Sequence, residues 1–516
     1  DGKASSFFWD AVVYHHTFAT GGHGYDESFG PADKLSGQVD GTVKANGDTR
    51  SCESCNVYNM MKFTRTLFSI KPDDKYSEFL ERGLFNHVLA SIDPATGQTC
   101  YMVSVGVNVT HEYQNMQSSF TCCVGTGYES HALHADGMYD ESANGDRLWV
   151  NLYAPSTANW RSAGLAVSMD TAFPIGDTAS LKVSKLASVG PLPAAGERTI
   201  SLRRPLWAGE GFAIKVNGTA LANLPAPGSF VDIKRPWADG DTVTLEMPKT
   251  LHTEPLPDNP NRMALMWGPL VLAGDLGTGG GRGGGGGGRR GAGGAGNNNL
   301  VFVTADKSIT HWLKPVAGKP GTFEASTAGN QPITFVPFYQ LAQHRYGIYW
   351  DVYTPQEWSK QSPEYAAQME AQDKIAKATV SFAQPGQMQP ETDHNFAGEN
   401  TQPIIVADQP GRRGTGWFSM ELAVDGGGTS QALVVTYSST EEKKRNFDIL
   451  IDGTKLASQT IDPPADGAAK KFYDQTYNIP KEMVAGKQKV TVKFQAAAES
   501  ETAGVFGIRV VRTAAP

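Results

Sequence analysis

The sequence has only five cysteines in 516 residues, an odd number and far too few for a scaffold held by disulfides. It has no run of eighteen apolar residues, so we expect no transmembrane helix. It has no excess of positive charge, because the net charge is −8, which argues against nucleic acid or an anionic membrane as the main partner. It also lacks a visible export signal. Residues 5–9 (SSFFW) read as the middle of a packed helix, so we expect further sequence before Asp1.

What the sequence does have is a clustered arrangement of those cysteines. Cys52 and Cys55 flank Glu53, and Cys122 and Cys123 are adjacent about seventy positions later. This clustering indicates either a metal site or a redox site. Zinc takes four ligands drawn from thiolate, imidazole and carboxylate.

Four such ligands are available without Cys52 or Cys100, namely Glu53, Cys55, Cys122 and Cys123. Their spacing matches none of the common zinc-finger patterns, so three alternatives stay open at this point. Adjacent cysteines can form a vicinal disulfide, thiols can be buried and inert, and a Cys122–Cys123 pair can be oxidised reversibly in a thiol redox protein.

The first part of the chain has the periodicity of helices. Residues 57–68 and 76–92 place apolar side chains at helical spacing, and a third helix fits residues 127–139. Asp73 and Asp74 are suited to the start of the second helix, because acidic side chains stabilise the positive end of the helix dipole. These helices predict part of a helical domain.

From about residue 146 the apolar period changes to two, and Asn217-Gly218 is a strong hairpin signal. Short strands at regular spacing predict a β-sandwich. We expect strands at residues 148–153, 165–169, 198–202, 212–216, 242–246, 300–302 and 333–336.

Residues 277–299 are almost all glycine with a few arginines, which predicts a flexible surface insertion rather than an RNA-binding tract. Residues 357–376 are polar and predict a helical connector. Further strands are expected at 432–437, 447–451 and 489–494, in a final unit that resembles a small jelly-roll accessory domain of the carbohydrate-binding type.

Several strings are similar to motifs of one known family. They are a glycine-rich loop ending in an acid at residues 20–29 (TGGHGYDESF), a helix start at 52–60 (CESCNVYNM), a helix at 81–87 (ERGLFNH), the double-cysteine motif at 122–129 (CCVGTGYE) and the segment 268–274 (GPLVLAG). With these strings the chain resembles the DUF1680 glycoside hydrolases of families 127 and 146, which include β-L-arabinofuranosidases. The aspartate before Glu27 departs from the glycine that the family usually has there.

The resemblance implies a multidomain α + β protein. We expect the C-terminal part of an (α/α)6 catalytic barrel at residues 1–145 and a β-sandwich at 146–350 with the insertion at 277–299. A connector at 351–389 and a jelly-roll-like β-sandwich at 390–516 would follow.

The resemblance also implies a reaction and its residues. Cys122 would be the nucleophile of a retaining hydrolase acting on β-L-arabinofuranosides, and Glu27 the acid/base. Zinc would be held by Glu53, Cys55, Cys122 and Cys123. Tyr101 and His23 are further candidates for contact with the sugar.

The partner implied by this resemblance is an arabinose-containing glycan, and the substrate class places the protein in the periplasm or outside the cell. Two other readings stay open: the same mechanism on a different sugar, and a non-catalytic carbohydrate-binding or scaffold protein. The sequence does not indicate the oligomeric state.

Overall fold

The computed structural model describes residues 2–25, 27–40, 51–186, 196–278, 300–406, 409–464 and 472–513. These residues form two compact units, one ending at Gln361 and one beginning at Ser362. The first unit holds helices and several sheets, and the second is rich in strands. The chain is therefore a mixed α and β multidomain protein, as predicted.

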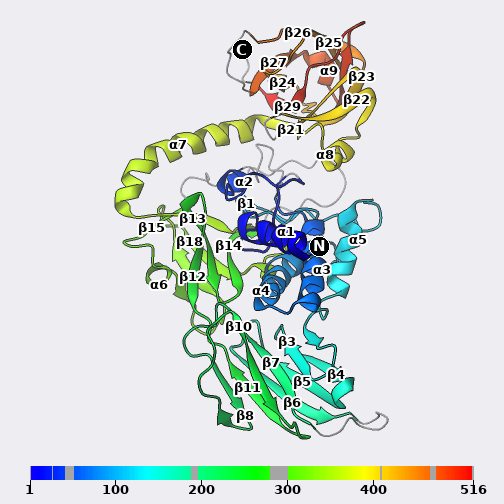
Figure 1. The fold of residues 1–516 in the computed structure, drawn as a ribbon. Helices are drawn as coiled ribbons and strands as arrows, with labels where there is room; N and C mark the ends of the chain where they lie inside the picture. The colour runs from blue at the N-terminus through cyan, green and yellow to red at the C-terminus, as the bar shows by residue number, and fades with distance from the viewer. Residues whose placement is uncertain are drawn as a thin grey trace. The chain divides into compact units, whose positions relative to one another are not determined.

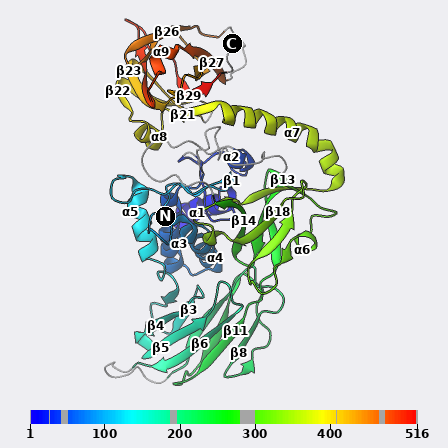
Figure 2. The same cartoon turned by 180° about the vertical axis from the view of Figure 1, so that it is seen from behind.

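Helices form the start of the first unit (Figures 1 and 2). Their apolar faces share one core that includes Trp9, Val57, Phe68 and Phe79. The Trp9 indole donates a 2.7 Å hydrogen bond to Thr64, which joins the first helix to the third. The elements are α1 (Gly2–His15), α2 (Ser36–Asp40), α3 (Ser54–Ile70), α4 (Asp74–Gly83), a π-helical turn (Leu84–Val88), a 3-10 turn (Leu89–Ser91) and α5 (Cys122–Ala132).

The predicted start of the second helix is confirmed. Asp73 caps α4, with its carboxylate accepting a hydrogen bond from the backbone N–H of Lys75, and Asp74 lies in the first turn. The third helix was predicted too late in the sequence. α5 begins at Cys122 and ends at Ala132, because Leu133 leaves helical geometry and the chain turns at Gly137, whose φ is +78°.

Two sheets with a common core follow the helices over residues 139–246, where the period of two predicts strands; the predicted bounds of the sandwich, residues 146–350, stay a prediction. Asn217 and Gly218 both have positive φ in the hairpin between β8 and β9, as their sequence predicts. One sheet has the order β10 (Ser229–Arg235), β7 (Arg198–Arg204), β3 (Arg147–Val150) and β2 (Tyr139–Glu141). The other has the order β4 (Ser156–Trp160), β5 (Leu165–Thr171), β6 (Thr178–Lys185), β11 (Thr242–Glu246), β8 (Ala213–Val216) and β9 (Thr219–Ala220).

A separate sheet occupies the rest of the first unit and has its own cores. Its main path is β15 (Val301–Val303), β20 (Tyr349–Tyr353), β13 (Asn259–Trp267), β14 (Leu270–Thr278), β18 (Pro332–Pro337), β17 (Phe323–Ser326) and β16 (Lys314–Pro315). Strands β1 (Val107–Val109), β12 (Leu251–Leu256) and β19 (His344–Gly347) join beside this path, and α6 (Ile309–Trp312) follows β15. Within the predicted glycine-rich insertion, residues 279–299 lie outside the described residues.

The helix α4 and the turn after it join the helical part to the sheets of the same unit. Arg82 forms a bidentate pair with Glu254 on β12, at 2.7 and 2.8 Å. The side chain of Asn86 bonds the backbone of Pro269 and Val271. On the sandwich side, Glu78 and Glu81 pair with the fully buried Arg203. These polar contacts fix the helices that carry the site described below.

Helix α7 (Pro355–Ala378) confirms the predicted helix at residues 357–376, and the second unit begins within it, at Ser362. Its central sheet has the order β26 (Thr454–Ile461), β25 (Arg445–Ile451), β28 (Lys489–Ala496), β23 (Gln409–Ala423), β29 (Val505–Arg512), β24 (Gln431–Ser438) and β27 (Phe472–Ile479). β21 (Thr379–Ala383) pairs with β29 and β22 (Ala397–Val406) with β23, while α8 (Met388–Asp393) and α9 (Lys481–Val484) lie between strands. No helix among the described residues is long and apolar enough to cross a membrane.

Candidate metal centre and catalytic site

The beginnings of two helices supply the cysteine cluster. Glu53 and Cys55 lie at the start of α3, and Cys122 and Cys123 are the first residues of α5. The N-terminus of a helix carries partial positive charge, which favours thiolate and carboxylate groups. The two cysteine segments lie far apart in the sequence but are adjacent in the fold. Each lies at a helix N-terminus, which stabilises an anionic ligand.

The four predicted ligands lie together. One ligand atom of each of Glu53, Cys55, Cys122 and Cys123 lies within 4.8 Å of the others. The Sγ atoms of Cys55 and Cys123 are 3.1 Å apart, and those of Cys122 and Cys123 are 3.9 Å apart. The Glu53 carboxylate lies 3.5 Å from the Cys122 sulfur and 3.6 Å from the Cys123 sulfur.

This donor set fits a thiophilic divalent cation such as zinc. Three sulfur atoms and one carboxylate oxygen are within reach of one central ion, and this is a set that zinc accepts. Without a cation the groups differ in their tendency to ionise, because hydrogen bonding to Cys123 lowers the pKa of Cys55 whereas the pKa values of Cys122 and Glu53 are raised. Burial raises the pKa of Cys122 to about 12, with hydrogen bonding to Cys55 and the charges of Cys55 and Glu53 acting in the same direction. Burial and the charge of Glu27 also raise the pKa of Glu53.

The four ligands differ in their access to solvent. Cys123 is fully buried and Cys55 is 7% exposed, whereas Cys122 is exposed. The Cys55 sulfur also contacts the hydroxyl of Thr126 at 3.1 Å. Cys122 is thus the one thiol of the cluster that a molecule arriving from solvent can reach directly.

A neighbouring segment places Tyr101 beside this cluster. The backbone N–H of Ser54 donates to the Tyr101 carbonyl at 2.9 Å, and Glu53 forms an antiparallel bridge with Met102. The Tyr101 hydroxyl donates a 2.5 Å hydrogen bond to Glu27 and lies 4.0 Å from the Cys122 sulfur. Tyr101 therefore links the predicted acid/base to the predicted nucleophile.

Glu27 lies in a tight loop that is joined to the same region. Tyr25 and Ser28 exchange two backbone hydrogen bonds around it, and Glu27 has a φ of +60°. Tyr25 also bridges to Ser51, just before Glu53. The Glu27 side chain is exposed, whereas Tyr101 is buried. Its position follows from this loop geometry and not from a helix or a strand.

His23, predicted to contact the sugar, is fully buried. Its ring stacks on Phe29 with a centroid distance of 5.8 Å, and its Nε2 atom has no hydrogen-bond partner among the described residues. Burial lowers the pKa of His23 to about 4, so the ring is neutral at pH 7. Its contact with a sugar stays a prediction.

Cys52 and Cys100 are fully buried and lie outside the group of Glu53, Cys55, Cys122 and Cys123. Cys52 instead packs against Gly22, where an added Cβ would lie 2.6 Å from the Cys52 Cβ. Gly127 has a similar role on α5, since a Cβ there would lie 2.4 Å from the Thr99 hydroxyl. Both glycines let segments around the site approach closely.

Thr126 contacts the cluster but is not among the site residues predicted from the sequence. Its hydroxyl touches the Cys55 sulfur, and it lies four residues after Cys122, on the same face of α5. Helical spacing from Cys122 could have indicated this position.

Four known domain families match successive parts of the chain. The family described as the β-L-arabinofuranosidase GH127 catalytic domain matches residues 1–136, and that described as the GH127 middle domain matches residues 147–249. A domain of unknown function, DUF4986, matches residues 252–352, and a family of unknown function, DUF6805, matches residues 374–511. No curated protein matches the sequence.

Two solved structures of glycoside hydrolases share the fold of about two thirds of this chain. A glycoside hydrolase is 18% identical with a TM-score of 0.50, covering 67% of this chain and 61% of its own. A GH127 β-L-arabinofuranosidase from Geobacillus stearothermophilus T6 is 19% identical with a TM-score of 0.50, covering 68% of this chain and 58% of its own. A family 35 carbohydrate-binding module from Clostridium thermocellum is 14% identical with a TM-score of 0.20, covering 26% of this chain and 97% of its own.

The chain thus spans about three fifths of the length of the first two structures. The matches to the GH127 catalytic and middle domains lie in the first 249 residues, and the fold of these two solved structures agrees with them. In this part the chain is similar to the β-L-arabinofuranosidases of glycoside hydrolase family 127, as its sequence predicted.

Proposed function

We propose that this protein is a retaining glycoside hydrolase that releases β-L-arabinofuranose from plant-type glycans. The observation that carries the proposal is the spatial arrangement of the Cys122, Tyr101 and Glu27 side chains. An exposed thiol lies 4.0 Å from a tyrosine hydroxyl, and that hydroxyl is hydrogen-bonded to an exposed carboxylate. A retaining mechanism needs this pair of a nucleophile and a separate acid/base group.

In the first step, the Cys122 sulfur attacks the anomeric carbon and the bond from that carbon to the leaving oxygen breaks. Glu27 gives its proton to the leaving oxygen, so the aglycone departs as an alcohol. The product of this step is a sugar joined covalently to Cys122, and Glu27 is left as a carboxylate.

In the second step, Glu27 takes a proton from water as the water oxygen attacks the same carbon. The carbon–sulfur bond breaks, Cys122 leaves as a thiolate, and Glu27 is again protonated. Tyr101 holds the Glu27 carboxylate by its hydrogen bond, and we place the bound sugar against Tyr101, between these two groups.

Glu53, Cys55, Cys122 and Cys123 would hold zinc. A zinc ion bound there keeps its thiol ligands deprotonated at neutral pH and offsets the mutual repulsion of the ligands. Cys55 and Cys123 are buried on the side away from solvent, so the same four residues leave the Cys122 sulfur accessible to substrate.

For the fold we propose that α1 and α3–α5 correspond to later helices of an (α/α)6 barrel, within a domain that ends near residue 145. The aromatic side chains of Phe7, Phe8 and Tyr14 on α1 are 75%, 50% and 58% exposed, which suits packing against another helix. We also propose domain boundaries near residues 350 and 389. A periplasmic or extracellular location is proposed as well, because the substrate would be a plant polymer.

The test is a panel of nitrophenyl glycosides assayed before and after removal of metal. We expect turnover of the β-L-arabinofuranoside, loss of that turnover after chelation, and recovery when zinc is returned. Preferred turnover of another sugar would support the same mechanism on a different substrate. Bound zinc without turnover would support a carbohydrate-binding or scaffold role. Full activity in metal-free protein, or reversible Cys122–Cys123 oxidation with no bound metal, would contradict the proposal.

A further inference from the structure

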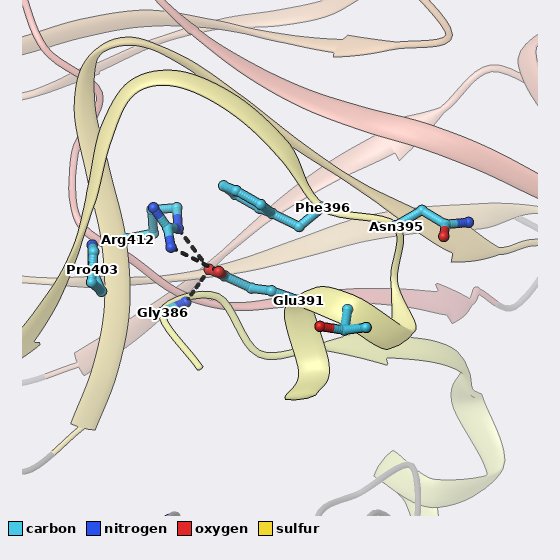
Figure 3. A pocket seen from close by; sticks show the side chains of 7 residues that line it. Gly386, Glu391, Asn395, Phe396, Pro403 and Arg412 are labelled. Carbon is cyan, nitrogen blue, oxygen red and sulfur yellow. Dashed lines mark hydrogen bonds and ion pairs between the residues drawn. The ribbon is translucent and has the colours of Figure 1, made fainter. Parts of the chain in front are cut away.

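The second unit contains a cavity of about 610 Å³. It is lined by residues from the loop after β21, from α8, and from the neighbouring strands β22 and β23 (Figure 3). This volume lies in the range of pockets that take small molecules, about 300–1,000 Å³. No lining residue of this cavity belongs to the candidate metal centre in the first unit.

A buried ion pair lines the cavity. Arg412 binds Glu391 through two hydrogen bonds, from Nε at 2.6 Å and from Nη2 at 2.7 Å, and both residues are 8% exposed. The backbone N–H of Gly386 donates to the same carboxylate at 2.6 Å. Burying two charges is costly unless they are paired and hydrogen-bonded. These three hydrogen bonds offset that cost and fix the positions of both side chains.

One nitrogen of the Arg412 guanidinium, Nη1, is available to donate to a ligand. Glu391 binds Nε and Nη2, whereas Nη1 makes no hydrogen bond among the described residues. Because the Glu391 carboxylate cancels the charge of Arg412, the cavity offers a strong hydrogen-bond donor without net positive charge.

Apolar ring surfaces flank this donor. The Cζ atom of Arg412 lies 4.3 Å from the centroid of the Phe396 ring. Phe396 and Pro403 lie on opposite sides of the ion pair (Figure 3). Beyond Phe396, Asn395 donates through Nδ2 to Glu421 at 2.7 Å, which leaves its Oδ1 as an acceptor at the rim.

The backbone around the cavity has features of a preformed site. Gly386 has a φ of +85°, and a Cβ there would lie 2.2 Å from the carbonyl oxygen of Gly411, so only glycine fits. The register of β22 and β23 shifts between Glu399 and Thr401, and this irregularity bends β22. A preformed cavity loses less conformational entropy when it binds a ligand.

We propose that this cavity binds a neutral sugar residue of a polysaccharide, at a site separate from the catalytic one. A sugar ring has an apolar C–H face for Phe396 and Pro403 and hydroxyls for the Nη1 donor of Arg412 and the Oδ1 acceptor of Asn395. An anionic sugar is disfavoured, because the Arg412 charge is already neutralised and Glu421 adds negative charge beside Asn395.

The test uses the full chain and two variants that spare the fold. Arg412→Lys keeps a positive charge for Glu391 but removes the planar fork and its Nη1 donor. Asn395→Gly removes the rim acceptor, and glycine accepts the positive φ of 48° at this position. The matched control is Asn400→Gly, which changes an exposed asparagine with a φ of 52° in β22 that does not line the cavity.

Binding is measured by calorimetry with neutral arabinan, xylan and galactan and with anionic polygalacturonate. We expect at least one neutral polymer to bind, and Arg412→Lys to weaken that binding about tenfold, as loss of a charged hydrogen bond predicts. Asn395→Gly should weaken it several-fold. Asn400→Gly should bind like the parent chain, and thermal melts should show that each variant is folded.

Three results would overturn the proposal: no binding of any neutral polymer, tighter binding of polygalacturonate, or unchanged binding in both Arg412→Lys and Asn395→Gly. A loss of binding in Cys122→Ser with no loss in Arg412→Lys would assign the sugar to the catalytic site instead.

Discussion

Replacing Cys122 with serine should lower kcat/KM on a nitrophenyl β-L-arabinofuranoside by a factor of at least about 10³, because removal of a covalent nucleophile has effects of this size or larger. A serine hydroxyl is far less acidic than a thiol and is a poor nucleophile at neutral pH. No other thiol of the cluster can replace it, since Cys55 and Cys123 are buried. Initial rates on purified variant and parent chain measure the effect.

The matched control is Cys52→Ala. Cys52 is adjacent to Glu53 in the sequence but packs against Gly22 and is not one of the four clustered ligands. Its removal should change turnover by less than about tenfold, within the usual effect of a conservative core change. Turnover in Cys122→Ser equal to that in Cys52→Ala would show that Cys122 is not the nucleophile.

Replacing Glu27 with glutamine should lower turnover of a natural arabino-oligosaccharide by about 10²–10⁴-fold, the contribution usual for general acid–base catalysis. A nitrophenyl leaving group needs less protonation, so the first step on that substrate should be less affected. The second step still lacks its base, and the sugar–Cys122 adduct should accumulate. Intact-protein mass spectrometry detects this adduct.

Glu129→Gln is the control for this substitution, because Glu129 is also exposed and lies on α5, the helix that begins at Cys122. It should keep nearly full activity. Equal turnover of Glu27→Gln and the parent chain on both kinds of leaving group would remove Glu27 from the mechanism.

The sequence predicted the cluster of Glu53, Cys55, Cys122 and Cys123 better than it predicted the contact between Tyr101 and Glu27. The cluster could be predicted because cysteine is rare in this chain and four of the five cysteines fall in two short segments. The hydrogen bond from Tyr101 to Glu27 could not, since it joins residues 74 positions apart and depends on loops around Tyr25 and Ser54. No periodic pattern encodes such loops.

The helix predicted from the apolar pattern also had wrong bounds, because the path of the chain determined where the helix ends. The apolar pattern of residues 127–139 predicted a helix, but the chain turns at Gly137 and Tyr139 pairs with Val150 in a sheet. Tertiary pairing thus overrode helical propensity. In the second unit, the three strands that were predicted are confirmed as β24, β25 and β28, whereas the pair of Glu391 and Arg412, 21 positions apart, had no signature in the sequence.

The central claim, that one zinc ion is held by Glu53, Cys55, Cys122 and Cys123, is tested most directly by elemental analysis combined with X-ray absorption at the zinc edge. The account predicts one zinc per chain with three sulfur neighbours and one oxygen neighbour. It also predicts that Cys55→Ser reduces the sulfur count to two or abolishes zinc binding. Absence of zinc from protein purified without chelators, or zinc whose sulfur count is unchanged in Cys55→Ser, would contradict it.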